Sequence, residues 1–492
     1  MTHRGILART LVLGAVLAGS TLGAAGIPKD KEAVEHALNR LAYGPKPGDV
    51  ERVQEMGLSN WIDRQLHPDG IDDSALKARL PEQPERPAQF ADQMEARRWG
   101  RQSVQALSAE KVVRAVYSER QLEEQLVDFW FNHFNVFAGK GRTSEWIADY
   151  ERHAIRPHVF GKFRDLLEAT AKSPAMLFYL DNWLSADPAA AERQQELQQQ
   201  RAARLGVANP NRPQPQGQQR RRGLNENYGR ELLELHTLGV DGGYTQKDII
   251  EVARAFTGWT IAPQNQKAAG QPGVPFGARG RRPQLAPGAV QEGEFRFTPM
   301  LHDSGEKIVL GHKIKAGGGI EDGETVLDIL AAHPATAQHI AFQLTQRLVA
   351  DEPPAALVDR AAARFRMTNG DLREVVRTIV TSPEFLAATV RDAKFKTPFT
   401  LVVSTMRTTG ATVSDAHALV QTLQQMGQPL YMCQPPTGYH NTADAWISAG
   451  GLVSRMNFAT RLASGNMPGV TLPANPPNDL ALRLGSPEFQ RF

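Results

Sequence analysis

The chain of 492 residues contains a single cysteine, Cys433. It therefore cannot form an internal disulfide, and cysteine-based zinc sites, iron–sulfur sites and cytochrome attachment are excluded. The common catalytic signatures are also missing, since there is no Gly-x-Ser-x-Gly, no His-Glu-x-x-His and no phosphate-binding loop. The sequence thus identifies no cofactor or metal, and it leaves open whether the protein is an enzyme.

The chain also lacks a large excess of either positive or negative charge, because its formal net charge is only +3. Hydrophobic residues make up 41% and charged residues 22%, which is an ordinary globular composition. Such a balance indicates no specific nucleic-acid partner. The length allows one to three domains with a large core.

The N-terminus has the three parts of a secretory signal. His3, Arg4 and Arg9 form a positive segment, Leu11 to Ala25 carries no charge, and small residues precede a cleavage position near Ala25. A membrane anchor is the weaker interpretation, because spanning a bilayer takes about 20 apolar residues. We therefore expect a signal peptide at 1–25 and an exported protein, periplasmic or extracellular.

Helical periodicity dominates two stretches, an N-terminal region at 30–185 and a main region at 224–465. Asp30 is placed to cap a helix, and Thr245-x-x-Asp248 is a capping-box pattern that opens another. A mainly α fold with a large multi-helix body follows from this pattern.

One small β-hairpin is expected at about 294–310, because residues 294–298 alternate, 303–305 form a turn and 307–310 can return. Residues 466–492 are expected to be a C-terminal tail.

Two tracts interrupt the body and predict disordered insertions. Residues 193–222 hold seven arginines against one glutamate, with many glutamines, and 264–291 hold four basic residues and no acid. The tracts are solvated insertions by default, and weak contact with an anionic polymer is the alternative.

A helical wheel places two ionisable groups on apolar faces. His133 falls inside the apolar stripe of the helix around 122–137, and Glu231 falls among leucines in the helix around 224–238. Glu226 and Arg230 belong to a polar stripe beside Glu231. On the same wheel His236 lies off both stripes and is expected to be a boundary residue.

Two interpretations of these groups are open. In the first, His133, Glu226, Arg230 and Glu231 converge with His302 as an acid–base or metal site. In the second, Glu231 is neutralised by a basic residue of a neighbouring helix, because an unpaired buried carboxylate is costly. The candidate basic partners are Arg40, His133 and Arg254.

The chain resembles the bacterial family catalogued as domain of unknown function 1800. The likeness runs from about His36 to Arg461 and rests mainly on three segments. These are His36-Ala37-Leu38-Asn39-Arg40-Leu41-Ala42-Tyr43-Gly44, Phe129-Trp130-Phe131-Asn132-His133-Phe134 and, above all, Asn225-Glu226-Asn227-Tyr228-Gly229-Arg230-Glu231-Leu232-Leu233-Glu234-Leu235.

The resemblance implies export and a possible partnership with another exported protein encoded nearby, but it brings no catalytic residues. Three functions are therefore open. The first is a periplasmic or extracellular binding or assembly protein that acts with a co-exported partner. The second is an enzyme, such as a metal-dependent hydrolase, and the third is a surface protein that binds polyanions through its basic tracts.

Overall fold

The computed structural model describes residues 27, 30–87, 90–190, 200, 204, 223–262 and 293–492. The expected signal peptide at 1–25 and the expected insertion at 264–291 lie outside the described residues, as does 193–222 apart from residues 200 and 204.

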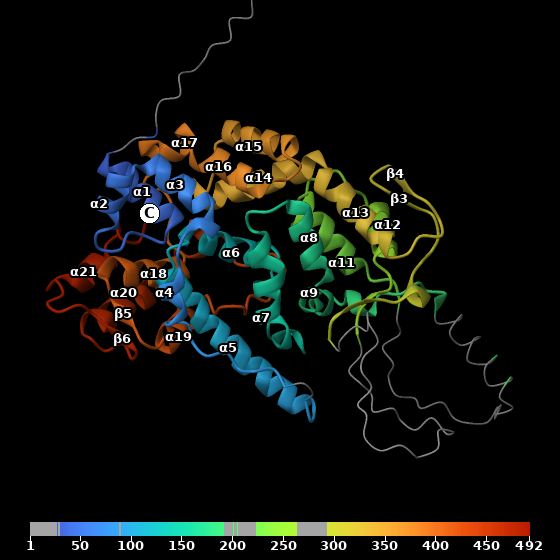
Figure 1. Cartoon of the computed structure of the whole chain (residues 1–492), viewed down its shortest axis with the longest axis horizontal. Coiled ribbons are helices and arrows are strands. Elements are labelled where there is room, and N and C mark those ends of the chain that lie inside the picture. Colours follow the sequence, from blue (N-terminus) through green and yellow to red (C-terminus); the bar gives the residue numbers. More distant parts are fainter. Residues whose placement is uncertain are drawn as a thin grey trace, which may run out of the picture.

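The described part of the chain is mainly helical, as the sequence predicts (Figure 1). The helices up to residue 262 are α1 (Lys31–Leu41), α2 (Asp49–Met56), α3 (Leu58–Leu66), α4 (Ser74–Lys77), α5 (Gln93–Tyr117), α6 (Gln121–His133), α7 (Ile147–Asp149), α8 (Phe163–Lys172), α9 (Pro174–Tyr179), α11 (Glu226–Glu231) and α12 (Gln246–Ala255). Those after residue 293 are α13 (Ile320–Ala332), α14 (Pro334–Leu348), α15 (Ala355–Met367), α16 (Leu372–Val380), α17 (Pro383–Leu386), α18 (Pro398–Thr409), α19 (His417–Gln425), α20 (Ala449–Ala463) and α21 (Leu480–Gly485). Single 3-10 turns are η1 (Pro68–Gly70), η2 (Thr143–Glu145), η4 (Arg156–His158), η5 (Asn182–Leu184), η7 (Pro299–Leu301), η8 (Ala388–Val390) and η9 (Ala443–Ala445).

Local capping explains where several helices begin. Asp30 accepts the backbone N–H of Ala33 at 2.9 Å and caps α1. Thr245 and Asp248 form the reciprocal capping box that opens α12, which confirms the pattern seen in the sequence.

Two short segments are π-helical, η3 (Tyr150–Ile155) and η6 (Leu232–Thr237). The first follows α7 and the second continues α11 without a break. π-Helical turns are rare and often occur at functional sites.

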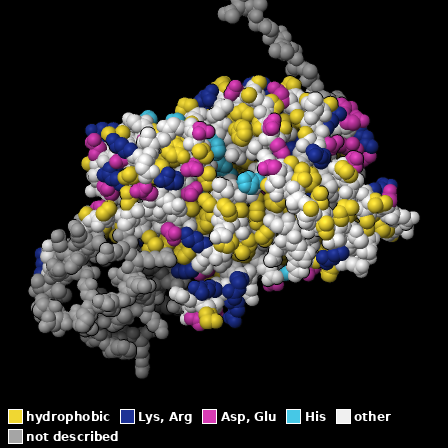
Figure 2. Space-filling view, turned by 180° about the vertical axis from the view of Figure 1, so that it is seen from behind, with side chains coloured by type: hydrophobic (Ala, Val, Ile, Leu, Met, Phe, Trp, Pro, Cys, Tyr) yellow, Lys and Arg dark blue, Asp and Glu magenta, His cyan; other side chains and the backbone are white. Residues whose placement is uncertain are grey.

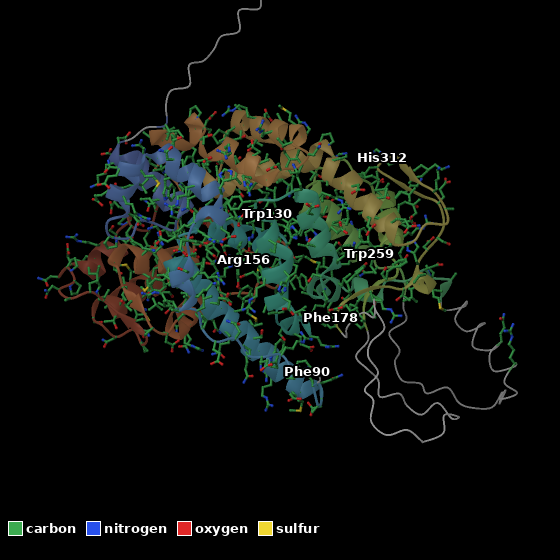
Figure 3. All side chains as sticks on the ribbon, in the orientation of Figure 1. Phe90, Trp130, Arg156, Phe178, Trp259 and His312 are labelled. Atoms are coloured by element: carbon green, nitrogen blue, oxygen red, sulfur yellow. The ribbon has the colours of Figure 1, made fainter. Side chains whose placement is uncertain are left out.

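The helices share one core. α13 to α17 form an arc along the upper edge of Figure 1, α18 to α21 gather at the lower left, and α5 projects downward from the middle. Trp130 of α6 is fully buried at the centre and packs against Phe134 and Phe163, each with its ring centroid 6.0 Å away (Figure 3). Phe90, just before α5, marks the lower tip of the projection in Figure 3.

The predicted hairpin at 294–310 is wrong in its pairing. Residues Phe295–Phe297 do form a strand, β2, but β2 pairs antiparallel with β1 (Trp259–Ile261). The second segment, β3 (Lys307–Val309), pairs instead with β4 (His312–Ile314), across the turn at Leu310 and Gly311. Distant pairing with β1 buries Trp259, and this non-local packing decides the arrangement.

The C-terminal residues 466–492 pack onto the body. β6 (Val470–Thr471) pairs with β5 (Thr412–Val413), and Leu480 and Leu484 of α21 are buried. Phe395 and Arg491 form an antiparallel bridge that fixes the last residues beside α18. No described helix has the length and apolar character needed to cross a membrane.

Candidate binding cleft and the predicted site residues

His133 closes α6 and lies in a cluster of three histidines with His236 of η6 and His339 of α14. The ring centroids of His236 and His339 are 6.4 and 6.1 Å from that of His133. Nε2 of His133 is 3.2 Å from the carbonyl oxygen of His236, and Nε2 of His339 is 3.2 Å from that of Leu235. The last carbonyls of a helix have no partner within it, so these two imidazoles satisfy the end of η6.

Burial lowers the pKa of all three histidines, that of His236 to about 3. The cluster is therefore neutral at ordinary pH and joins η6 to α6 and α14. The expectation that His236 is a boundary residue is wrong, because its side chain is only 2% exposed. The π-helical turn adds a residue to the repeat, so a wheel drawn at about 3.6 residues per turn loses its phase after Glu231.

Glu226 and Arg230 are held together by a residue of the next helix. Nε2 of Gln246 donates to Glu226 at 2.6 Å, and Arg230 donates to Oε1 of Gln246 at 2.8 Å. The amide of Gln246 thus bridges the two charges and fixes α11 against α12. This contact is exposed, which suits a structural bridge between two helices.

Glu231 is half-buried rather than enclosed by leucines. Burial and the nearby carboxylate of Glu234 raise its pKa, while Arg230 lowers it. The expected basic partner from another helix is not found within the described residues: Arg40 donates to the carbonyl of Val390, and Arg254 pairs with Asp303.

His302 belongs to a buried polar network beside residues 303–305. Its Nε2 is 3.1 Å from Oδ2 of Asp322, and its Nδ1 is 2.9 Å from the carbonyl oxygen of Thr257. The same Oδ2 accepts the ammonium group of Lys307 at 2.7 Å. Lys307 and Asp322 are 0% and 2% exposed, so this network is closed to solvent.

The five candidate residues thus lie in three places: the histidine cluster, the α11–α12 surface and the Asp322 network. Across the described chain, no side-chain hydrogen bond or ion pair joins His133 to His302, or either histidine to Glu226, Arg230 or Glu231. Nor does the described part hold a group of three or more His, Cys, Asp or Glu arranged to bind a metal ion. A catalytic role for His133, Glu226, Arg230, Glu231 or His302 stays a prediction.

The structure adds a charged cavity that the sequence did not indicate. Lys111 of α5 is 2.9 Å from Oδ1 of Asp128, and Arg347 is 2.9 Å from Oδ2 of the same carboxylate. Tyr431 donates to Glu151 of η3 at 2.7 Å, and Glu151 lies 3.8 Å from Lys111. The cavity lined by Lys111, Asp128, Arg347 and Tyr431 is about 30 Å³, which is space for about one water molecule.

The end of α6 organises this region. Asn132 exchanges two hydrogen bonds of 2.7 Å with the backbone of Tyr439, and Asn135 donates to the carbonyls of Cys433 and Pro435 at 3.0 and 2.8 Å. Gly438 must be glycine, because a Cβ there would lie 2.3 Å from the carbonyl oxygen of Asn132. The paired charges and the small volume show that this cavity is closely packed against the loop at 428–441.

A much larger hollow lies on the other side of this loop. A cleft of about 760 Å³ separates α5 from α19, and residues 429–432 stand between it and the charged cavity, with Leu430 facing both. One wall comes from Arg97, Arg101, Val104, Gln105, Ser108 and Ala109 of α5, and the opposite wall comes from His417, Val420, Gln421 and Gln424 of α19. The floor is formed by Ala138, Gly139, Gly141, Ser144, Pro429, Leu430 and Met432.

Close helix packing positions the first wall. Gly100 of α5 lies so near η2 that a Cβ there would be 2.5 Å from Oγ of Ser144. Beyond this contact α5 projects from the body, and Figure 2 shows Lys and Arg side chains gathered at the lower edge, where the projection lies. Across the cleft, Gln105 reaches His417, with 2.6 Å between Nε2 of the two side chains.

Sequence reasoning missed the cleft, since its two walls are more than 300 residues apart. A local signal does exist in α5, where Arg97, Arg101 and Gln105 repeat every four residues on one face. Such a stripe does not by itself show that an apolar floor and a second wall lie next to it.

Comparison with known proteins gives one finding. The family model described as "Protein of unknown function (DUF1800)" matches residues 36–491, nearly the whole chain, and the protein belongs to this family. No curated protein and no solved structure matches the chain.

Proposed function

We propose that this DUF1800 protein is exported and works as a binding or assembly protein with a co-exported partner, holding its ligand in the α5–α19 cleft. The observation that carries the proposal is the cleft itself. Its volume of about 760 Å³ lies within the range of ligand pockets. Its wall also combines apolar side chains with several polar groups, which is the usual make-up of a binding site.

The polar groups support binding because several are unused. Gln421 and Gln424 are exposed, and no side-chain hydrogen bond of either is found within the described residues. A ligand that pairs with these amides gains hydrogen bonds without first breaking others in the protein.

The binding proposal is tested with anilinonaphthalene sulfonate, an aromatic anion that becomes fluorescent in apolar surroundings. We expect it to bind the mature protein, and Gln421→Trp to weaken the signal by narrowing the cleft. The matched control is Gln425→Trp, which alters an exposed residue of the same helix outside the cleft wall. Equal fluorescence of the two variants would contradict ligand binding in the cleft.

The export proposal is supported by the charged start and the uncharged run Leu11–Ala25. Replacing Leu11, Leu13 and Val16 with glutamate should leave the full-length chain in the cytoplasm, as measured by fractionation and N-terminal mass analysis. Mature protein outside the cytoplasm after these changes would overturn the proposal.

A further inference from the structure

Two arginines in the cleft wall have no partner among the described residues. Arg97 and Arg101 are exposed, and no side-chain hydrogen bond or ion pair is found for either in that part of the chain. Further along the same helix the situation differs, because Arg114 pairs with Glu110 at 2.7 Å and Arg152 shares that carboxylate. The two cationic groups in the cleft are thus left available for a ligand.

Among the described residues, the cleft offers these arginines no carboxylate, because its lining there contains neither aspartate nor glutamate. The acid beside it, Asp415, is used by His417, whose Nδ1 it accepts at 2.8 Å. A ligand that brings negative charge is therefore the one that this wall complements.

The spacing of the two arginines further limits the class of ligand that fits the cleft. Residues one helical turn apart carry Cβ atoms about 5–6 Å apart. In an extended peptide, side chains two residues apart point to the same side at about 6.6 Å. Two acidic side chains at that spacing can face Arg97 and Arg101 together, while the residues between them face Leu430 and Met432 on the floor.

The opposite wall suits a peptide backbone. Each of the free amides of Gln421 and Gln424 can donate to a peptide carbonyl and accept from a peptide N–H. At about 760 Å³ the cleft has room for a short peptide segment.

We propose that the cleft binds an extended acidic peptide segment of the co-exported partner, with carboxylates at alternate positions and apolar residues between them. This inference rests on the proposed binding function and adds the chemistry of the ligand. The arginine pair accounts for the preference for acidic side chains. The apolar floor accounts for the apolar residues that alternate with them in the peptide.

The test uses three fluorescein-labelled peptides and the mature protein at low salt, measured by fluorescence anisotropy. The first is Leu-Glu-Leu-Glu-Leu, the second is Leu-Glu-Glu-Leu-Leu with the same composition, and the third carries lysine in place of glutamate. We expect the first to bind most tightly, because its two glutamates share one side of the extended chain. Added salt should weaken its binding.

Matched variants locate the site. The double change Arg97→Gln and Arg101→Gln should raise the Kd of the first peptide about tenfold or more, since charge-assisted hydrogen bonds are lost. Arg98→Gln is the control, because Arg98 is exposed on the same helix but lies outside the cleft wall. Gln421→Trp should weaken binding and Gln425→Trp should not.

The outcomes separate this inference from the proposed function. If the lysine peptide binds as well as the first and Gln421→Trp weakens the binding of both, the cleft binds ligands but the acidic preference is refuted. If no peptide binds while anilinonaphthalene sulfonate still enters the cleft, the peptide class is refuted and the binding function stands. If the first peptide binds equally to Gln421→Trp, it binds elsewhere and the inference fails.

Discussion

Replacing Asp322 tests whether the network around His302 is a structural element. The carboxylate accepts the ammonium group of Lys307 at 2.7 Å and faces Nε2 of His302 at 3.1 Å. Asp322→Ala removes the only carboxylate that pairs with Lys307 among the described residues. The carbonyls of Asp303 and Gly305 still accept from Lys307 at 2.5 and 2.9 Å, but they carry no full charge.

The expected cost follows from burial. Lys307 is 0% exposed, so its charge cannot be hydrated in the variant. Removing one partner of a buried pair costs roughly 3–5 kcal/mol, because the other charge is left uncompensated. Asp322→Asn keeps an acceptor and the side-chain shape, so its loss of stability should be smaller.

Urea denaturation followed by circular dichroism measures these differences through the midpoint. The control is the double variant Asp322→Leu and Lys307→Met, which removes both charges and should be more stable than Asp322→Ala alone. Peptide binding in the cleft should be unchanged in Asp322→Asn, since the cleft shares no residue with this network. A cost below about 1 kcal/mol for Asp322→Ala would refute the reasoning.

Three further substitutions are expected to act as follows. Glu231→Gln should change the unfolding free energy by less than about 1 kcal/mol, because burial and Glu234 already raise the pKa of this carboxyl and no described basic residue pairs with it; a large loss in urea would reveal a basic partner. Gly438→Ala should cost about 1–3 kcal/mol, since its φ is +69° and the added Cβ would meet Asn132; unchanged thermal melting would contradict this. Stability should fall as pH drops from 6.5 toward 3, because the His236 imidazole gains a proton in the unfolded chain but resists it when buried, and His236→Asn should flatten that fall in urea titrations at a series of pH values.

Features set by neighbouring residues could be predicted from the sequence. The helical body, the cap at Asp30 and the capping box of Thr245 and Asp248 depend on contacts within three or four residues. The strand character of 295–297 and 307–309 is local too. Their pairing was missed because β2 prefers a strand more than 30 residues away, and alternation carries no information about that choice.

The candidate site residues show a second limit. The wheel assumed one α-helix across 224–238, and the change to π-helix at Leu232 rotates every later side chain. His236 therefore turns inward and is only 2% exposed. The wheel was reliable only up to Glu231, where the α-helical hydrogen-bonding pattern that it assumed ends.

The two π-helical turns also contribute contacts that hold the floor of the cleft in place. η3 supplies Glu151, which holds Tyr431 in the loop that forms the floor of the cleft. η6 is fixed to the end of α6 by His133, and α6 in turn holds the same loop through Asn132 and its contact with Tyr439. Buried polar contacts of this kind specify one arrangement, because breaking any of them leaves a polar group unsatisfied. His133 thus supports the cleft indirectly, because it joins η6 to α6 and α6 holds the loop that lines the cleft.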